Sequence, residues 1–250
     1  MRARVPTSIL VLALVATAAA QTPPSPAGPL LVLSVIDVRP EMFAEFGDLQ
    51  AQTMEAQKKG GLAWRETWNV AQFGLPYRVG VLRPLTSFAE LDGQPATVKG
   101  AGADQARVIN ERARRMIVAQ QIYALRARPD LGYGNRDAEP TLIVLSMIAV
   151  APGRNADFEA IVKSDIVPGH KEGGASYLAA SQVVLGGNTN QYLFITPYTD
   201  FASLGKGNPV LRGLGADRFA RFNQKLAGVV TNVDQQVMRF NAALSFRAKP

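Results

Sequence analysis

Apolar residues form two continuous runs, at residues 30–38 and 142–150, each rich in Val, Ile and Leu. Such runs are typical of strands that are covered on both faces. Pro40 and Pro152 follow them and should end the strands. Downstream of each run, apolar residues recur near the 3.6-residue period of a helix. These residues are Phe46, Leu49 and Met54 after the first run, and Phe158, Ile161, Val162 and Ile166 after the second.

The segments that follow have the same order after each run. Glycine pairs at 60–61 and 173–174 predict turns. Further strands are predicted at 62–70, around 77–83 and at 119–128, and in the second half at 175–184, around 190–196 and at 233–241. A second main helix is predicted to begin near the Ala-Asp of a Gly-x-Gly-Ala-Asp motif that occurs twice. Each half therefore reads as a βαββαβ unit.

The two halves also align residue by residue. "LLVLSVIDVRP" (30–40) matches "LIVLSMIAVAP" (142–152), and "KGAGADQARVIN" (99–110) matches "RGLGADRFARFN" (212–223). One extra residue separates Phe158 from the glycine pair of the second half. The order of matches never breaks, which indicates an internal duplication of about 110 residues.

A βαββαβ order predicts a four-stranded antiparallel sheet with two helices on one face, the ferredoxin-like arrangement. The other face is apolar and needs a cover, which a second copy provides sheet against sheet. We therefore expect an α+β protein with two ferredoxin-like repeats, at 30–134 and 135–250, packed as a pseudo-twofold barrel. With the ending "LRARPDLGYG" (125–134), this tandem pattern resembles the dimeric α/β-barrel superfamily, in particular its NIPSNAP-like and antibiotic-biosynthesis-monooxygenase-like groups, in a fused, secreted form. The resemblance implies a superfamily of cofactor-free oxygenases, haem-degrading enzymes and isomerases.

The first twenty residues have the pattern of a cleaved secretory signal peptide. Arg2 and Arg4 form a basic start, an apolar run covers 9–16, and Ala18-Ala19-Ala20 offers a cleavage site. The alternative is an uncleaved N-terminal anchor. A Pro-rich leader at 21–29 follows, and no later run is long enough to be a transmembrane segment. We expect a secreted or periplasmic protein, and the sequence does not decide between the two.

The composition narrows the chemistry. The chain has 250 residues, a formal net charge of +7, one histidine and no cysteine. It therefore has no disulfides and no thiolate nucleophile, and a single His without a close carboxylate cluster predicts no metal site and no cofactor. Basic residues are scattered except at Arg112, Arg114 and Arg115, which we interpret as a solvated helix face. No nucleic-acid partner is expected.

The second predicted strand of the first half carries the main candidates for chemistry. Alternation places Trp64, Glu66 and Trp68 on one face, and Tyr177 is the counterpart of Trp64 in the second half. These residues could line an apolar ligand pocket in which a buried Glu66 acts as a base, or they could belong to a packed core. Tyr77, at the start of the third strand, is a further ligand-binding candidate.

His170 is the only histidine and lies in a predicted loop, where the first half reads "QKKGG". It could be an exposed polar residue, a general base or a ligand of haem iron. The resemblance implies Asn, Trp and His at haem-degrading sites; Trp64, Trp68 and Asn69 are present, but no His follows in that half, which argues against haem degradation. Arg126 and Arg239 recur on the last strand and could clamp a carboxylate or form structural ion pairs.

The repeated Gly-x-Gly-Ala-Asp motif lacks the third glycine of a dinucleotide fingerprint and does not follow a strand. We interpret Asp104 and Asp217 as capping or first-turn residues of the second helix. The leading functional hypothesis is a protein that binds a small apolar or aromatic molecule or a protein partner. The alternative is a cofactor-free monooxygenase-like enzyme with an aromatic substrate, and a structural envelope protein is a third possibility. Oligomerisation beyond the internal pseudo-dimer is left open.

Overall fold

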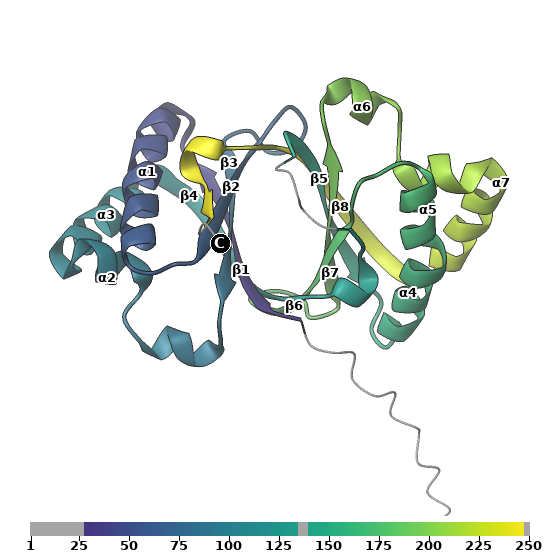
Figure 1. Cartoon of the computed structure of the whole chain (residues 1–250), viewed down its shortest axis with the longest axis horizontal. Helices are drawn as coiled ribbons and strands as arrows, with labels where there is room; N and C mark the ends of the chain where they lie inside the picture. Colours follow the sequence, from purple (N-terminus) through teal and green to yellow (C-terminus); the bar gives the residue numbers. More distant parts are fainter. Residues whose placement is uncertain (1–27, 135–139, 248–250) are drawn as a thin grey trace, which may run out of the picture.

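The structure is a computed structural model, and it describes residues 28–134 and 140–247 of the 250. The predicted signal peptide and most of the predicted leader lie outside the described residues. Strands form a central barrel, with helices packed outside it on two opposite sides (Figure 1). The protein is therefore of the α+β class.

The elements of residues 30–127 run in the order βαββαβ, with the short helix α2 and the longer helix α3 preceding the last strand. They are β1 (Leu30–Val38), α1 (Phe43–Lys59), β2 (Trp64–Val70), β3 (Arg78–Leu85), α2 (Ala96–Ala101), α3 (Ala103–Met116) and β4 (Ile117–Ala127). Short 3-10 helices lie at Pro40–Met42, Phe88–Asp92 and Pro129–Leu131.

The elements of residues 142–247 repeat this order and add a short strand. They are β5 (Leu142–Val150), α4 (Asn155–Ile161), a π-helix (Val162–Ile166), α5 (Val167–Glu172), β6 (Ala179–Leu185), β7 (Gln191–Tyr198), α6 (Phe201–Gly205), α7 (Pro209–Leu226), β8 (Val230–Phe240), a 3-10 helix (Ala242–Leu244) and β9 (Phe246–Arg247). The predicted strand at 175–184 begins at Ala179, because Leu178 forms an isolated bridge with Tyr133 instead.

Eight antiparallel strands close into a barrel. Their order is β3-β1-β4-β6-β7-β5-β8-β2, and β2 pairs with β3 to complete the circle. The halves of the chain meet at two seams, where β4 pairs with β6 (Leu125 opposite Val183) and β2 pairs with β8 (Trp68 opposite Phe240). The predicted antiparallel barrel is confirmed.

Apolar residues on both faces of the strands are explained by two kinds of core. Ile36 and Val38 of β1 pack outward against Phe46 and Leu49 of α1. Leu33 of the same strand packs inward with residues of β3, β4, β6 and β7. Alternate residues of one strand thus serve the outer core and the barrel interior, which is why the run shows no polar face.

The Gly-x-Gly-Ala-Asp motif has a packing role in both halves. A Cβ at Gly100 would overlap the backbone oxygen of Ala56, and a Cβ at Gly213 would overlap that of Gly169, so two helices touch closely at each glycine. The next glycines, Gly102 and Gly215, have φ of 82° and 70°, values that glycine adopts readily, and each separates a short helical segment from a long one. Helix packing accounts for the glycines.

Candidate functional site

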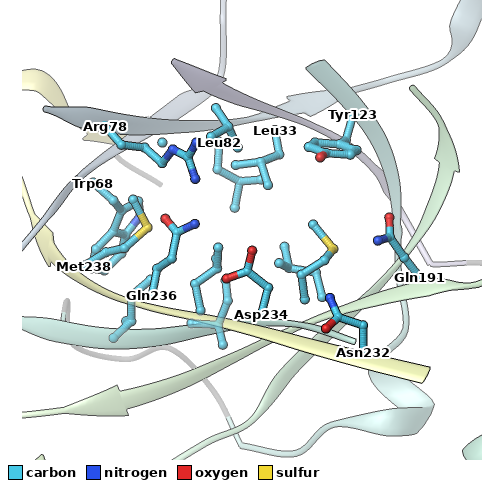
Figure 2. A pocket seen from close by; sticks show the side chains of 17 residues that line it. Leu33, Trp68, Arg78, Leu82, Tyr123, Gln191, Asn232, Asp234, Gln236 and Met238 are labelled. Atoms are coloured by element: carbon cyan, nitrogen blue, oxygen red, sulfur yellow. The ribbon is translucent and has the colours of Figure 1, made fainter. Parts of the chain in front are cut away.

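The barrel encloses a cavity of about 170 Å³, which we call the lumen (Figure 2). Inward-facing side chains of the strands make most of its wall. The apolar wall includes Leu33, Trp68, Leu82, Leu145, Leu193 and Met238.

Polar side chains gather toward one end of the lumen. Arg78 and Gln191 stand at the starts of β3 and β7, and Asp234 lies early in β8. Asp37 binds Arg78 through two hydrogen bonds, Nε to Oδ1 at 2.6 Å and Nη2 to Oδ2 at 2.9 Å. These bonds raise the pKa of Arg78 against the opposing effect of burial. This end of the lumen is therefore polar and charged.

The structure separates the two tryptophans. Trp68 lines the lumen and packs in one buried cluster with Tyr177, Ile143 and Met238. Trp64 packs against a neighbouring cluster around Leu33 and does not border the lumen cavity. The fold thus brings Trp68 and Tyr177 together. Trp64, four residues before Trp68 on β2, is a packing residue.

Glu66 is 2% exposed and accepts a hydrogen bond from Arg247 Nη2 at 2.5 Å. Arg247 belongs to β9, which pairs with the start of β2 at Trp64. The carboxylate therefore forms an ion pair with the C-terminal segment, and it is not among the residues lining the lumen cavity. This geometry gives Glu66 a structural partner and no access to a ligand in the cavity.

Three other candidates have their side chains outside both cavities, although Arg239 pairs with Asn69 next to Trp68. Arg126 donates to the backbone oxygen of Gly28 at 3.4 Å, and the Arg239 guanidinium lies over the ring of Phe201, 5.9 Å from its centroid. Tyr77 has a φ of 62° and packs edge-on against Phe43. None of the three lines the lumen or the pocket described next.

A second cavity lies outside the barrel wall, between the sheet of the second half and helices α5 and α7. We call it the outer pocket. Its volume is about 420 Å³, and it is bounded by outward-facing residues of β5, β7 and β8. Most of its lining is apolar, with Phe158, Ile166, Phe194, Phe219, Phe222 and Leu226 among the residues.

His170 lines the outer pocket and is 6% exposed. The prediction that it lies in a loop is wrong, because it belongs to α5. Burial, with a smaller contribution from the charge of Arg212, lowers the pKa of His170 to about 4. Its Nδ1 is buried and has no hydrogen-bond partner among the described residues. The imidazole is therefore neutral at physiological pH.

The remaining polar groups of the outer pocket sit on the sheet and on α7. Gln235 Nε2 donates to Ser146 Oγ at 2.9 Å, and both residues line the pocket. Burial raises the pKa of Tyr198, which therefore keeps its hydroxyl proton as a donor. Thr196 of β7, Asn223 of α7 and Asn208, which caps α7, also line the pocket. A few polar groups in an apolar wall are typical of small-molecule sites.

The first half has a different filling at the corresponding place. Arg65, which aligns with Leu178, is 1% exposed and donates to Gln57 Oε1 at 2.9 Å, to Gln50 Oε1 and to Thr67 Oγ1 at 3.3 Å. Burial lowers the pKa of Arg65 to about 10, and its partners are neutral amides and a hydroxyl. A long side chain thus occupies space between β2 and α1 where the second half has a leucine.

The helix that carries His170 also differs from its counterpart. α1 has 17 residues, whereas α4, the π-helix and α5 have 7, 5 and 6, one residue more in all. A π-helix accommodates an inserted residue inside a helix, and such insertions are frequent at functional sites. The π-helix at Val162–Ile166, just before His170, is a place where the one additional residue can be accommodated. His170 aligns with Gln57, a partner of Arg65.

Within residues 28–134 and 140–247, no group of three or more His, Cys, Asp or Glu side chains is placed to hold a metal ion. No helix in the same part of the chain is both long and apolar enough to cross a membrane.

No profile of a known protein family matches the chain, and no curated protein matches it. Solved structures do. An anthrone oxidase-like protein is 11% identical, with a TM-score of 0.61, over 90% of this chain and 96% of that one. Candidate monooxygenases from Fusobacterium nucleatum and Lactobacillus acidophilus are 12% and 13% identical, with TM-scores of 0.58 and 0.57, over 89% and 85% of this chain and 99% and 94% of theirs. The chain shares its α+β barrel fold with these proteins. At these identities the likeness concerns the fold alone.

Sequence reasoning missed most residues of the outer pocket. Thr196, Tyr198 and Gln235 look like ordinary strand residues, and no motif surrounds them. One signal was available: the inserted residue before His170 has no counterpart in the first half. It marks the half of the chain that carries the pocket, whereas Ser146 does not, because Ser34 matches it in the first half.

Proposed function

We propose that the protein binds a small apolar or aromatic molecule in the outer pocket. The observation that carries this proposal is an apolar cavity of about 420 Å³ containing a buried, neutral His170. Its volume falls within the range of ligand pockets, roughly 300–1,000 Å³. A protein partner needs an extended surface, whereas this cavity lies between a sheet and two helices. The small molecule is therefore the favoured ligand.

The polar groups indicate which ligand would fit. The unpartnered Nδ1 of His170 can accept or donate one hydrogen bond, depending on its tautomer, and leaving it without a partner costs stability. Tyr198 keeps its proton and can donate. A planar molecule with one or two hydroxyl or carbonyl groups would satisfy both residues while its rings contact the apolar wall.

The test is native mass spectrometry of the protein purified from its own host, combined with a variant that closes the pocket. Val144 lines the outer pocket, and its neighbour Leu145 lines the lumen. We expect a retained molecule in the wild type and in Leu145→Trp, and none in Val144→Trp. Retention by Val144→Trp, or no ligand bound by the wild type from a panel of apolar aromatics, would contradict the proposal.

A second candidate function is cofactor-free oxygenation of an aromatic substrate in the same pocket. The neutral imidazole of His170 is the feature that favours it, since such chemistry begins with loss of a substrate proton. The fold shared with candidate monooxygenases and with an anthrone oxidase-like protein is consistent with it. However, a base whose pKa is about 4 provides little driving force for proton transfer. Binding is therefore the primary proposal.

Oxygen uptake in the presence of anthrone separates the two functions. Catalysis would give uptake by the wild type that falls at least tenfold in His170→Gln, whose amide keeps a hydrogen-bonding group without the base. Binding without catalysis would give no uptake above the protein-free rate, while both proteins retain the ligand.

We also propose that the chain is a tandem, duplicated form of the barrel that is exported after cleavage near residue 20. The same glycine contacts at Gly100 and Gly213, and the same strand order in both halves, support the duplication into units at 30–134 and 135–250. Export rests on the sequence pattern alone. The mass of the mature protein from its host tests it, and an intact N-terminus would contradict it.

A further inference from the structure

The geometry points to a second ligand site in the lumen, for a single aromatic ring that carries an amino group on a short alkyl arm. This site is separate from the outer pocket because β5 forms a wall between them. Val144 and Leu145 are consecutive residues of β5 that point to opposite sides of the wall, the first into the outer pocket and the second into the lumen. The inference is independent of the proposed function.

The size and wall of the lumen fit one aromatic ring. Its volume is about 170 Å³, and an apolar cavity of roughly 150 Å³ binds benzene. Leucine and isoleucine side chains of both sheets form the wall, with Trp68 and Met238 side by side at one edge of the cavity (Figure 2). Thioether sulfur and indole both make favourable contacts with an aromatic ring.

The two ends of the lumen differ in their surroundings. β9 and the ion pair of Arg247 with Glu66 lie at the start of β2, beside the Trp64 packing cluster. Asn232 and Asp234 lie at the other end and are exposed. A ligand would therefore enter ring first and leave its polar group among the side chains of the polar end.

The charges at the polar end favour a cation. Arg78 donates two hydrogen bonds to Asp37, whereas Asp234 forms no salt bridge within the described part of the chain, although its charge also raises the pKa of Arg78. These three groups sum to one negative charge. The Asp234 carboxylate and the Gln236 amide both extend toward the centre of the cavity (Figure 2). An ammonium group would bind Asp234 and accepting amide oxygens, whereas a carboxylate would be repelled.

The experiment compares benzylamine, toluene and benzoate by isothermal titration calorimetry and ligand-observed NMR on the full-length protein. We expect benzylamine to bind most tightly, toluene more weakly, and benzoate not at all. Asp234→Asn should weaken benzylamine roughly fivefold, the effect of an exposed ion pair, without changing toluene. Equal binding of benzylamine and benzoate, or binding of none of the three, would overturn the assignment.

Two matched variants locate the site. Leu145→Trp fills the lumen and should abolish benzylamine binding, while Val144→Trp fills the outer pocket and should leave it within twofold of wild type. If Leu145→Trp does not fold, Leu33→Phe fills the lumen from the opposite sheet and should weaken benzylamine at least tenfold. If only Val144→Trp abolished benzylamine binding, the amine would bind in the outer pocket and the lumen site would be contradicted. That result would leave the proposed function standing.

Discussion

Arg247 Nη2 donates to Glu66 Oε1 at 2.5 Å across 181 residues of chain. The Glu66 side chain is 2% exposed, and the Arg247 side chain is 44% exposed. Arg247→Met leaves the buried carboxylate without this cation and should lower the free energy of unfolding by about 1–3 kcal/mol. Urea denaturation measures the loss. Arg114→Met, at an exposed position of α3, is the control and should change stability by less than about 0.5 kcal/mol.

A double-mutant cycle isolates the pair. In a Glu66→Gln background, Arg247→Met should cost clearly less than in the wild type, because no buried charge is then left behind. Equal losses in both backgrounds would show that Arg247 stabilises the protein only through packing.

The single histidine makes the protein sensitive to mild acid. In the unfolded chain His170 gains a proton as the pH falls through about 6.5, whereas in the folded protein burial, aided by Arg212, delays this to about 4. Unfolding therefore takes up a proton between these values. This contribution to stability is fully present above pH 6.5 and declines as the pH falls toward 4. The total loss is about 3 kcal/mol, and stability then levels off.

Two measurements check the acid effect. The ring protons of the one histidine give a single NMR titration, which should have a midpoint near 4, and a midpoint above 6 would contradict a buried neutral imidazole. His170→Gln should reduce the fall in stability between pH 6.5 and 4 compared with the wild type.

The buried Arg65 depends on neutral acceptors. Gln50→Leu removes one of them from a guanidinium that is 1% exposed, and it should destabilise the protein by about 1–3 kcal/mol. Gln52→Leu, at an exposed position on the same helix, should be nearly neutral. Thermal unfolding of the two variants compares them directly. Similar melting temperatures would mean that solvent replaces the lost acceptor.

The close helix contact at Gly213 also affects the outer pocket. Gly213→Ala places a methyl group against the backbone oxygen of Gly169, one residue before His170, and should destabilise the protein by about 2 kcal/mol. It should also weaken ligand retention in the outer pocket, because α5 must shift. Gly47→Ala, in the interior of α1 with no atom near the added methyl, should instead stabilise the protein by about 0.5–1 kcal/mol. Differential scanning calorimetry of the two variants shows whether each one lowers or raises the stability.

The sequence predicted the features that depend on local periodicity. Phe46 and Leu49 in one helix, and Phe158 and Ile161 in another, recur at helical spacing and are buried. The apolar runs form strands that are covered on both faces. The residues of the sites depend on non-local geometry. Alternation gives the direction of Arg65 but not the glutamines that surround it. No local signal predicts that Arg247 reaches Glu66, or that one inserted residue forms a π-helix before His170.

Closure of the barrel also sets the order in which the protein can fold during synthesis. β2 and β4 each need a second neighbouring strand from the other half of the chain. β8 pairs with β2, and β6 pairs with β4. When residues 30–127 have left the ribosome, they can form a sheet with two open edges and an uncovered apolar face. The missing neighbour of β4 ends at Leu185, and that of β2 ends only at Phe240. At about 5–20 residues per second, this interval lasts on the order of ten seconds. The nascent first half is therefore the species most exposed to aggregation, and it is the natural substrate for any chaperone that accompanies this chain.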